Sequence, residues 1–173
     1  MIELVELRKL VGQAIDCFGK NLNQVSDFIL SEGDFERLLT NKIEECLTEE
    51  YVIHNQVSYY GHTNALKYRV DCVVMKKDEV RDSIEYHKGY KYTSDSIAIE
   101  LKYYRKNADV STIKKDIDKS NVLEKSNAFL FVVALLEEDK GKADKILNIA
   151  NKYNNKNFSV KILIKNKEIW KSY

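Results

Sequence analysis

The chain has 173 residues, of which 44% are hydrophobic and 32% charged, and its formal net charge is +1. These values are typical of one globular domain and exclude a disordered chain. The sequence contains no proline, which excludes a proline-rich linker, and no apolar run approaches the ~20 residues of a membrane-spanning helix.

The charges are unevenly distributed along the chain. Residues 1–50 carry five basic and eleven acidic side chains, whereas residues 101–173 carry sixteen basic and nine acidic ones. This asymmetry is compatible with a polyanionic partner for the C-terminal part, and a solvated lysine-rich surface is the alternative. The three cysteines lack metal-ligand spacing and the N-terminus is too acidic for a secretory signal, so we expect reduced thiols in the cytoplasm.

The first part of the chain is predicted to be helical. Apolar residues recur at intervals of three and four from Leu4 to Ile29, and a break is expected near Gly19–Asn21 because glycine weakens a helix. Residues 1–30 are therefore predicted to form an N-terminal helical extension. Its apolar stripe is expected to pack on its own domain, with homodimerisation through this helix as the alternative.

A second helix is predicted after residue 31. Ser31 and Asp34 have the spacing of a capping box, with Asp34 as a rival cap. Glu32 and Glu36 are four residues apart and therefore lie on one side of this helix. Glu32 is expected closer to the centre of the apolar face, and Glu36 more securely inside the helix.

Strands and helices then alternate. Period-two patterns predict strands at 51–59, 68–75 and 96–104, with a polar, tyrosine-rich connection at 76–94; further elements are a helix at 109–125, a strand buried on both faces at 128–136, a helix at 140–152 and a strand at 158–164. This order predicts a single α/β domain over residues 1–173, in which helices flank a central mixed β-sheet.

Two predicted strands carry charged residues in unusual places. Asp71 interrupts an apolar strand, which is costly unless the carboxylate is paired or binds a cation. Alternation puts Val70, Cys72 and Val74 on the opposite face from Asp71. On the third strand, Glu100 and Lys102 share a face with Ala98, whereas Ile97, Ile99 and Leu101 point the other way. If these two strands are antiparallel, Asp71, Glu100 and Lys102 meet at one sheet edge.

Such a group has a definite chemistry. Two neighbouring carboxylates form a hard oxygen site suited to Mg²⁺ or Mn²⁺, which activates water and polarises a phosphodiester. A lysine two residues further on can orient that water or stabilise the transition state. The alternative is a buried carboxylate–lysine pair that neutralises itself.

Two segments, Arg69-Val-Asp71-Cys-Val-Val and Ile97-Ala-Ile-Glu100-Leu-Lys102-Tyr-Tyr, are preceded by a helix with early glutamates and followed by a lysine-rich one. From residue 31 to about 136 the chain thereby resembles the PD-(D/E)XK nuclease superfamily, which has a restriction-endonuclease-like core. Val70 stands where many members have proline, and the 28 residues between Asp71 and Glu100 exceed a simple hairpin.

The resemblance implies roles for individual residues. Asp71 and Glu100 would hold Mg²⁺ or Mn²⁺ together with the backbone carbonyl of Leu101, Lys102 would position the attacking water, and Glu32 or Glu36 would add to the site. Candidate nucleic-acid contacts are Tyr103, Arg105, Lys114, Lys115 and Lys119. The alternative for these five is ordinary strand-end residues and a solvated helix face.

The function implied by the resemblance is that of a Mg²⁺-dependent deoxyribonuclease of restriction or repair type, which leaves a 5′-phosphate. Because no separate target-recognition domain is evident, we expect a homodimer or a nuclease subunit of a larger DNA-processing complex. A non-catalytic interaction module with the same fold is the competing interpretation. A hydrolase of small phosphorylated substrates is disfavoured because the sequence has no glycine-rich phosphate loop.

Overall fold

The computed structural model describes residues 2–60, 66–78, 80, 96–105, 109–120, 128–135, 140–152, 158–164 and 171–172. The helical elements are α1 (Ile2–Lys20), α2 (Leu22–Val25), the 3-10 turn η1 (Ser26–Phe28), α3 (Glu32–Cys46), the 3-10 turn η2 (Val110–Thr112), α5 (Ile113–Ser120) and α6 (Lys140–Ala150). The strands are β1 (Tyr51–Tyr60), β2 (Leu66–Lys76), β3 (Ile97–Tyr104), β4 (Ala128–Leu135), β5 (Phe158–Ile164) and β6 (Lys171–Ser172).

The predicted order of helices and strands is confirmed in the described residues. The expected break after α1 is present, and the Asn21 side chain donates a hydrogen bond to the Cys17 carbonyl at 2.9 Å. The helix predicted at 109–125 begins as a 3-10 turn and is described only to Ser120. Most of the predicted tyrosine-rich connection lies outside the described residues.

The sheet is mixed, as predicted, and its strands follow chain order from β1 to β6. Antiparallel pairs join β1 to β2, β2 to β3 and β5 to β6, whereas β3–β4 and β4–β5 are parallel. The parallel pairs are possible because α5 and α6 lie in the connections that return the chain to the same end of the sheet. The protein is therefore an α/β fold.

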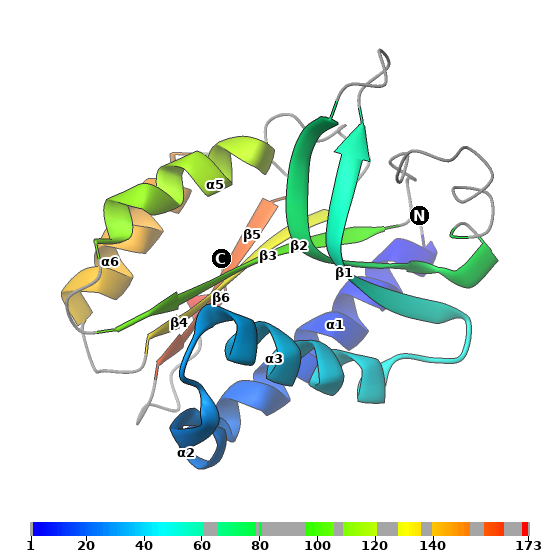
Figure 1. The fold of residues 1–173 in the computed structure, drawn as a ribbon, viewed down its shortest axis with the longest axis horizontal. Helices are drawn as coiled ribbons and strands as arrows, with labels where there is room; N and C mark the ends of the chain where they lie inside the picture. Colours follow the sequence, from blue (N-terminus) through cyan, green and yellow to red (C-terminus); the bar gives the residue numbers. More distant parts are fainter. Residues whose placement is uncertain are drawn as a thin grey trace.

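Helices cover both faces of the sheet (Figure 1). On one face, α1 and α3 pack over the inward side chains of the strands, in a cluster that includes Leu7, Val11, Phe35, Leu39, Ile99 and Leu101. On the other face, α5 and α6 form a second cluster that includes Ala98, Tyr104, Ile113, Val133, Ile146 and Ile162. The apolar stripe of α1 is thus buried in its own domain, and homodimerisation through this helix stays a prediction.

One expectation about strand β2 is wrong. Val70 was expected to share a face with Cys72 and Val74, but it packs in the α5–α6 cluster while they pack in the α1–α3 cluster. The alternation is interrupted at Asp71. Gln56 of β1 lies opposite Asp71, between the pairs Asn55–Cys72 and Val57–Val70, and has a positive φ of 53°. The outer part of the β1–β2 hairpin is turned relative to the rest of the sheet (Figure 1), and its register shifts between Tyr59 and Tyr60.

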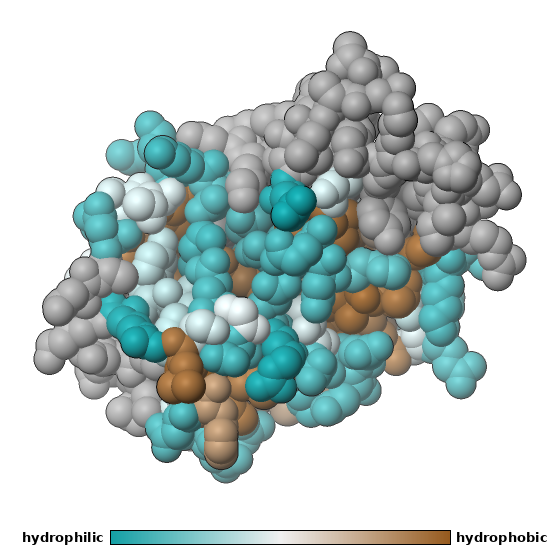
Figure 2. Space-filling model, viewed as in Figure 1, coloured by the Kyte–Doolittle hydropathy of each residue, from teal (hydrophilic) through white to brown (hydrophobic). Residues whose placement is uncertain are grey.

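Figure 2 shows hydrophilic side chains over most of the described part of one face, with some apolar atoms between them. Among the large apolar side chains that the structure describes, the exposed ones are Val5, Phe28 and Leu30.

Candidate active site where strands β2 and β3 separate

Asp71 and Glu100 lie where the ladder between β2 and β3 ends. The pairing covers Val74–Ile97, Val73–Ala98 and Cys72–Ile99, so Asp71 and Glu100 are the next residue on each strand. Beyond this point the Asp71 carboxylate accepts a hydrogen bond from the Leu101 N–H at 2.7 Å. A side chain therefore satisfies a backbone group that the adjacent strand no longer pairs with. The expected antiparallel arrangement of these two strands is confirmed.

The backbone of Leu101 contributes to this edge as well. In an extended strand the N–H and C=O of one residue point toward the same side. Because the Leu101 N–H donates to Asp71, its carbonyl also faces β2. Glu100 is almost fully buried, at 1% exposure. Two carboxylates, from Asp71 and Glu100, and the Leu101 carbonyl thus lie where β2 and β3 separate.

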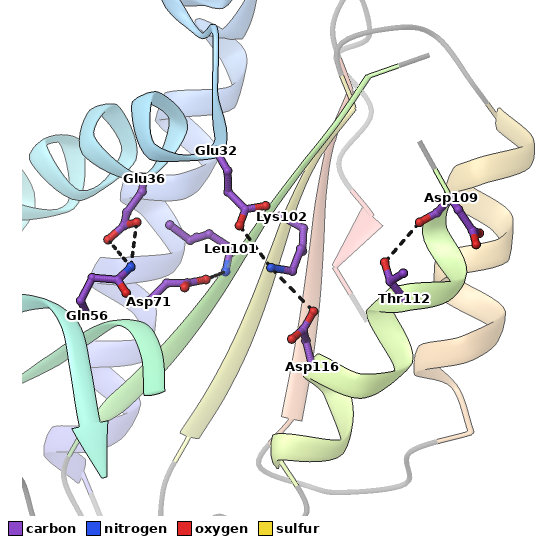
Figure 3. A network of polar contacts seen from close by, with 9 residues as sticks. All are labelled: Glu32, Glu36, Gln56, Asp71, Leu101, Lys102, Asp109, Thr112 and Asp116. Carbon is purple, nitrogen blue, oxygen red and sulfur yellow. Dashed lines mark hydrogen bonds and ion pairs between the residues drawn. The ribbon is translucent and has the colours of Figure 1, made fainter. Parts of the chain in front are cut away.

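Lys102 lies between two carboxylates (Figure 3). Its ammonium is 3.2 Å from Glu32 Oε1, at the start of α3, and 3.6 Å from Asp116 Oδ2, on α5. The Lys102 and Asp116 side chains are 18% and 19% exposed, whereas Glu32 is 46% exposed. The lysine that the sequence placed beside Glu100 is therefore held by residues from both helical layers.

The electrostatic environment keeps Lys102 protonated. Burial alone would lower the pKa of its ammonium, but the negative charges of Glu32, Asp116, Asp71 and Glu100 outweigh that effect and raise the pKa above its ordinary value. Lys102 is therefore within electrostatic reach of four carboxylates. Asp71, Glu100 and Lys102 therefore lie at the same end of the β2–β3 ladder, and the charges of both carboxylates act on Lys102.

The two candidate glutamates of α3 make different contacts. Glu36 accepts hydrogen bonds from the Gln56 amide at 3.1 and 3.3 Å, while Glu32 contacts Lys102. Burial raises the pKa of Glu36, the Gln56 hydrogen bond opposes this, and the charges of Asp71 and Glu32 reinforce it. The expectation that Glu32 projects closer to the apolar face is wrong: Glu32 is exposed and Glu36 half-buried, because α3 begins at Glu32.

Local sequence fixes the start of α3. The Ser31 hydroxyl accepts from the Asp34 N–H, and the Asp34 carboxylate accepts from the Ser31 N–H, so Ser31 is the cap and Asp34 completes the predicted capping box. The hydrogen bond from the Ser31 hydroxyl and one from the Leu30 N–H lower the pKa of Asp34. This motif holds Glu32 at the first position of the helix.

Two predicted nucleic-acid contacts bind the chain itself. The Tyr103 hydroxyl donates to the Ile29 carbonyl at 2.7 Å, and the Arg105 guanidinium donates to the Leu30 carbonyl. Arg105 also lies 5.9 Å from the centre of the Tyr103 ring. These contacts attach β3 to the segment that leads into α3, and a role in nucleic-acid binding stays a prediction.

The lysines predicted to contact nucleic acid lie on α5. Lys114 and Lys115 are exposed, and the side chain of Lys119 lies outside the described residues.

Sequence reasoning missed Gln56 and Asp116. Gln56 gives little signal, because a glutamine in a strand with a polar face is unremarkable. Asp116 was detectable: it is three residues after Ile113 and therefore shares the sheet-facing side of its helix. A carboxylate at such a position needs a partner, and Lys102 is that partner.

The carboxylate and carbonyl oxygens of this site are suitable ligands for a hard divalent cation. Most of these side chains, however, bind other groups of the protein. Among the residues that the structure describes, no three His, Cys, Asp or Glu side chains are grouped as a metal site. Glu32 and Asp116 bind Lys102, Glu36 binds Gln56 and Asp71 binds the Leu101 N–H. Carboxylate and carbonyl oxygens are nevertheless the ligands that Mg²⁺ and Mn²⁺ prefer.

Comparisons with known proteins yield no relatives. No protein-family model, curated protein or solved structure matches this chain. Within the described ranges, no helix has the length and apolar character required to cross a bilayer.

Proposed function

We propose that this chain is a Mg²⁺- or Mn²⁺-dependent deoxyribonuclease with a restriction-endonuclease-like core of the PD-(D/E)XK type. The observation that carries the proposal is the gathering of Asp71, Glu100, the Leu101 backbone and Lys102 where β2 and β3 separate. An inert scaffold has no need for a nearly buried glutamate and a lysine coupled to four carboxylates at this one position.

The residues that would hold the cation are Asp71, Glu100 and the Leu101 carbonyl. When bound there, such a cation supplies Lewis-acid activation of a phosphodiester and lowers the pKa of a coordinated water. Glu36 is the better placed of the two α3 glutamates to add to this set, because its charge interacts with that of Asp71.

Lys102 supplies hydrogen bonds and positive charge. A protonated ammonium has three donors and no acceptor, so Lys102 acts by orienting water or stabilising negative charge on the phosphate. Hydrolysis by in-line attack would leave a 5′-phosphate on the DNA.

Phosphate contacts are assigned to cations around this edge. Arg105 is exposed beside the segment before α3, and Lys114 and Lys115 are exposed on α5. Their charge belongs to the basic C-terminal part of the sequence, where phosphate neutralisation would contribute to DNA affinity. A homodimer or a subunit of a larger DNA-processing complex is the proposed working form.

Plasmid cleavage in the presence of Mg²⁺ or Mn²⁺ tests the proposal. Asp71→Asn and Lys102→Ala are each expected to lower the cleavage rate by about 100-fold or more, because each removes a group at the reacting centre. Asp144→Asn and Lys152→Ala change the same charges at exposed positions and serve as matched controls. Equal cleavage by wild type and all four variants would assign the activity to a contaminant or to another site.

A non-catalytic module of the same fold is the second candidate. The ion pairs of Lys102 favour it. The positive charge of this lysine already neutralises negative charge on Glu32 and Asp116, without a metal ion. Calorimetric titration with Mn²⁺ separates the two functions. The nuclease predicts binding that Asp71→Asn abolishes, whereas the module predicts no binding that depends on this carboxylate.

A further inference from the structure

Asp116 occupies a helix position that an apolar residue would ordinarily take. Ile113, one turn earlier, is fully buried against the sheet, and Asp116 lies on the same side of α5. Its side chain is only 19% exposed, whereas the intervening Lys114 and Lys115 are exposed. The helix therefore directs one carboxylate toward strand β3 and these two lysines toward solvent.

Lys102 is held from two directions. Glu32 reaches it from α3, which packs in the cluster on one face of the sheet, and Asp116 reaches it from α5, which packs on the other. A lysine side chain has four flexible methylene groups, and fixing it has an entropic cost of about 2 kcal/mol. Two opposing carboxylates on separate elements restrict the ammonium more than either one alone.

Asp116 is the more buried of the two partners, although Glu32 lies closer to the Lys102 ammonium, at 3.2 Å against 3.6 Å. Its pair with Lys102 joins two side chains that are each less than one-fifth exposed, whereas Glu32 is nearly half exposed. Water and salt screen a partly buried pair less than an exposed one. Glu32 also sits at the first position of α3, and its side chain is 46% exposed.

We propose that Asp116 is a positioning residue, which holds the Lys102 ammonium in place for the hydrolysis proposed above. The inference rests on that proposed function and adds a residue to it. Asp116 touches neither the substrate nor the reacting atoms, and it acts through its contact with Lys102.

The negative charge of Asp116 distinguishes a positioning role from a role in DNA binding. Removing a negative charge near a polyanionic substrate favours binding, so Asp116→Asn is expected to leave KM for DNA unchanged or lower it. A displaced Lys102 stabilises the transition state less well, so kcat is expected to fall by about tenfold or more. Asp116→Glu retains the carboxylate and is expected to recover most of the lost kcat.

The experiment combines kinetics with NMR of the lysine ammonium groups. The order parameter of the Lys102 ammonium is expected to fall in Asp116→Asn, to stay near the wild-type value in Asp116→Glu, and to be unaffected in Asp144→Asn. Asp144 is an exposed aspartate of α6 and provides the matched change in charge. If circular dichroism shows that Asp116→Asn does not fold, Asp116→Ser takes its place.

The outcomes are distinguishable. An unchanged Lys102 order parameter in the Asp116 variant overturns the inference, as does an altered order parameter with wild-type kcat. Failure of Asp116→Glu to recover kcat also overturns it, because a carboxylate would then not be what the site requires. Absence of DNA cleavage by the wild-type protein overturns the proposed function itself, and with it any role of Asp116 in hydrolysis.

Discussion

Gln56 combines a strained backbone with a contact near the candidate site. Its φ of 53° lies in the left-handed region, which costs a residue with a side chain about 1 kcal/mol or more. It lies opposite Asp71, and its amide binds Glu36. Strain of this kind persists where the surrounding structure enforces it, and it concentrates at functional sites.

Substitutions at Gln56 test this strain. Gln56→Gly and Gln56→Ala both remove the amide, but glycine adopts a positive φ without steric cost. Gln56→Gly is therefore expected to have a free energy of unfolding about 1 kcal/mol higher than Gln56→Ala, as measured by urea denaturation. At the neighbouring exposed strand residue Asn55, the order is expected to reverse, because glycine weakens a regular strand. Equal stabilities for the two Gln56 variants would contradict a strained backbone.

The central residues of the candidate site were predicted from charged side chains that interrupt apolar strands. Asp71, Glu100 and Lys102 stand out because charged residues interrupt apolar strands. The choice between Glu32 and Glu36 could not be made, because it depends on where the helix begins and how it is rotated on the sheet. Gln56 was not predictable, since its partner lies 20 residues away on another element.

The start of helix α3 determines the placement of both glutamates. Ser31 and Asp34 exchange hydrogen bonds, and the Asp34 carboxylate also accepts from the Leu30 N–H. These bonds lower the pKa of Asp34 in the folded chain, with the bond from Ser31 as the largest cause. A carboxyl with a lowered folded pKa stabilises the protein above its unfolded pKa, and that stability is lost as the pH falls.

The capping box predicts that the difference in melting temperature between wild type and Asp34→Asn depends on pH. Asp34→Asn is expected to have a lower melting temperature than wild type at pH 7. The difference should shrink below a pH of about 4, where the carboxyl of the unfolded chain becomes protonated. Melting curves followed by circular dichroism at several pH values check this. Asp144→Asn is the control, and a difference between wild type and Asp34→Asn that is constant across pH would contradict the prediction.

The order of the elements was predictable, but the geometry of β2 was not. Strand and helix periods predicted each major element to within a few residues, because apolar positions dominate both patterns. Val70 lies on the opposite face of the sheet from the one predicted, next to the irregular backbone at Gln56 and Asp71. No local sequence pattern indicates this irregularity. Likewise, the parallel pairing of β3 with β4 depends on the path of α5 over one face.

The N-terminal helix belongs to the core of the molecule. It was predicted as a helical extension that packs on its own domain, and Leu7, Val11, Ala14 and Ile15 are almost completely buried against α3 and the sheet. On β5, Lys161 strengthens this attachment by donating to the Gly12 carbonyl at 3.1 Å. Residues 2–20 are therefore expected to be necessary for folding rather than an accessory to it.

Two substitutions on α1 test whether this helix is part of the folded core or only loosely attached to it. Ile15 is fully buried, and Ile15→Ala is expected to lower the free energy of unfolding by about 2–5 kcal/mol. Val5 lies on the same helix but is 67% exposed. Val5→Ala is therefore expected to change the free energy of unfolding by less than about 0.5 kcal/mol. Urea denaturation measures both values. Similar small effects at the two positions would show that α1 is only loosely attached.

The attachment of Tyr103 and Arg105 to the carbonyls of Ile29 and Leu30 has a consequence for the distance between Lys102 and Glu32. The two side chains sit on elements that are already joined by a neutral phenol and by a guanidinium bound to a backbone oxygen. Concentrated salt would weaken the attraction between ammonium and carboxylate, but it would leave the phenol bond nearly untouched. The contacts of Tyr103 and Arg105 thus set the distance between β3 and the start of α3. This distance should be kept at ionic strengths at which the Lys102–Glu32 ion pair contributes little to stability.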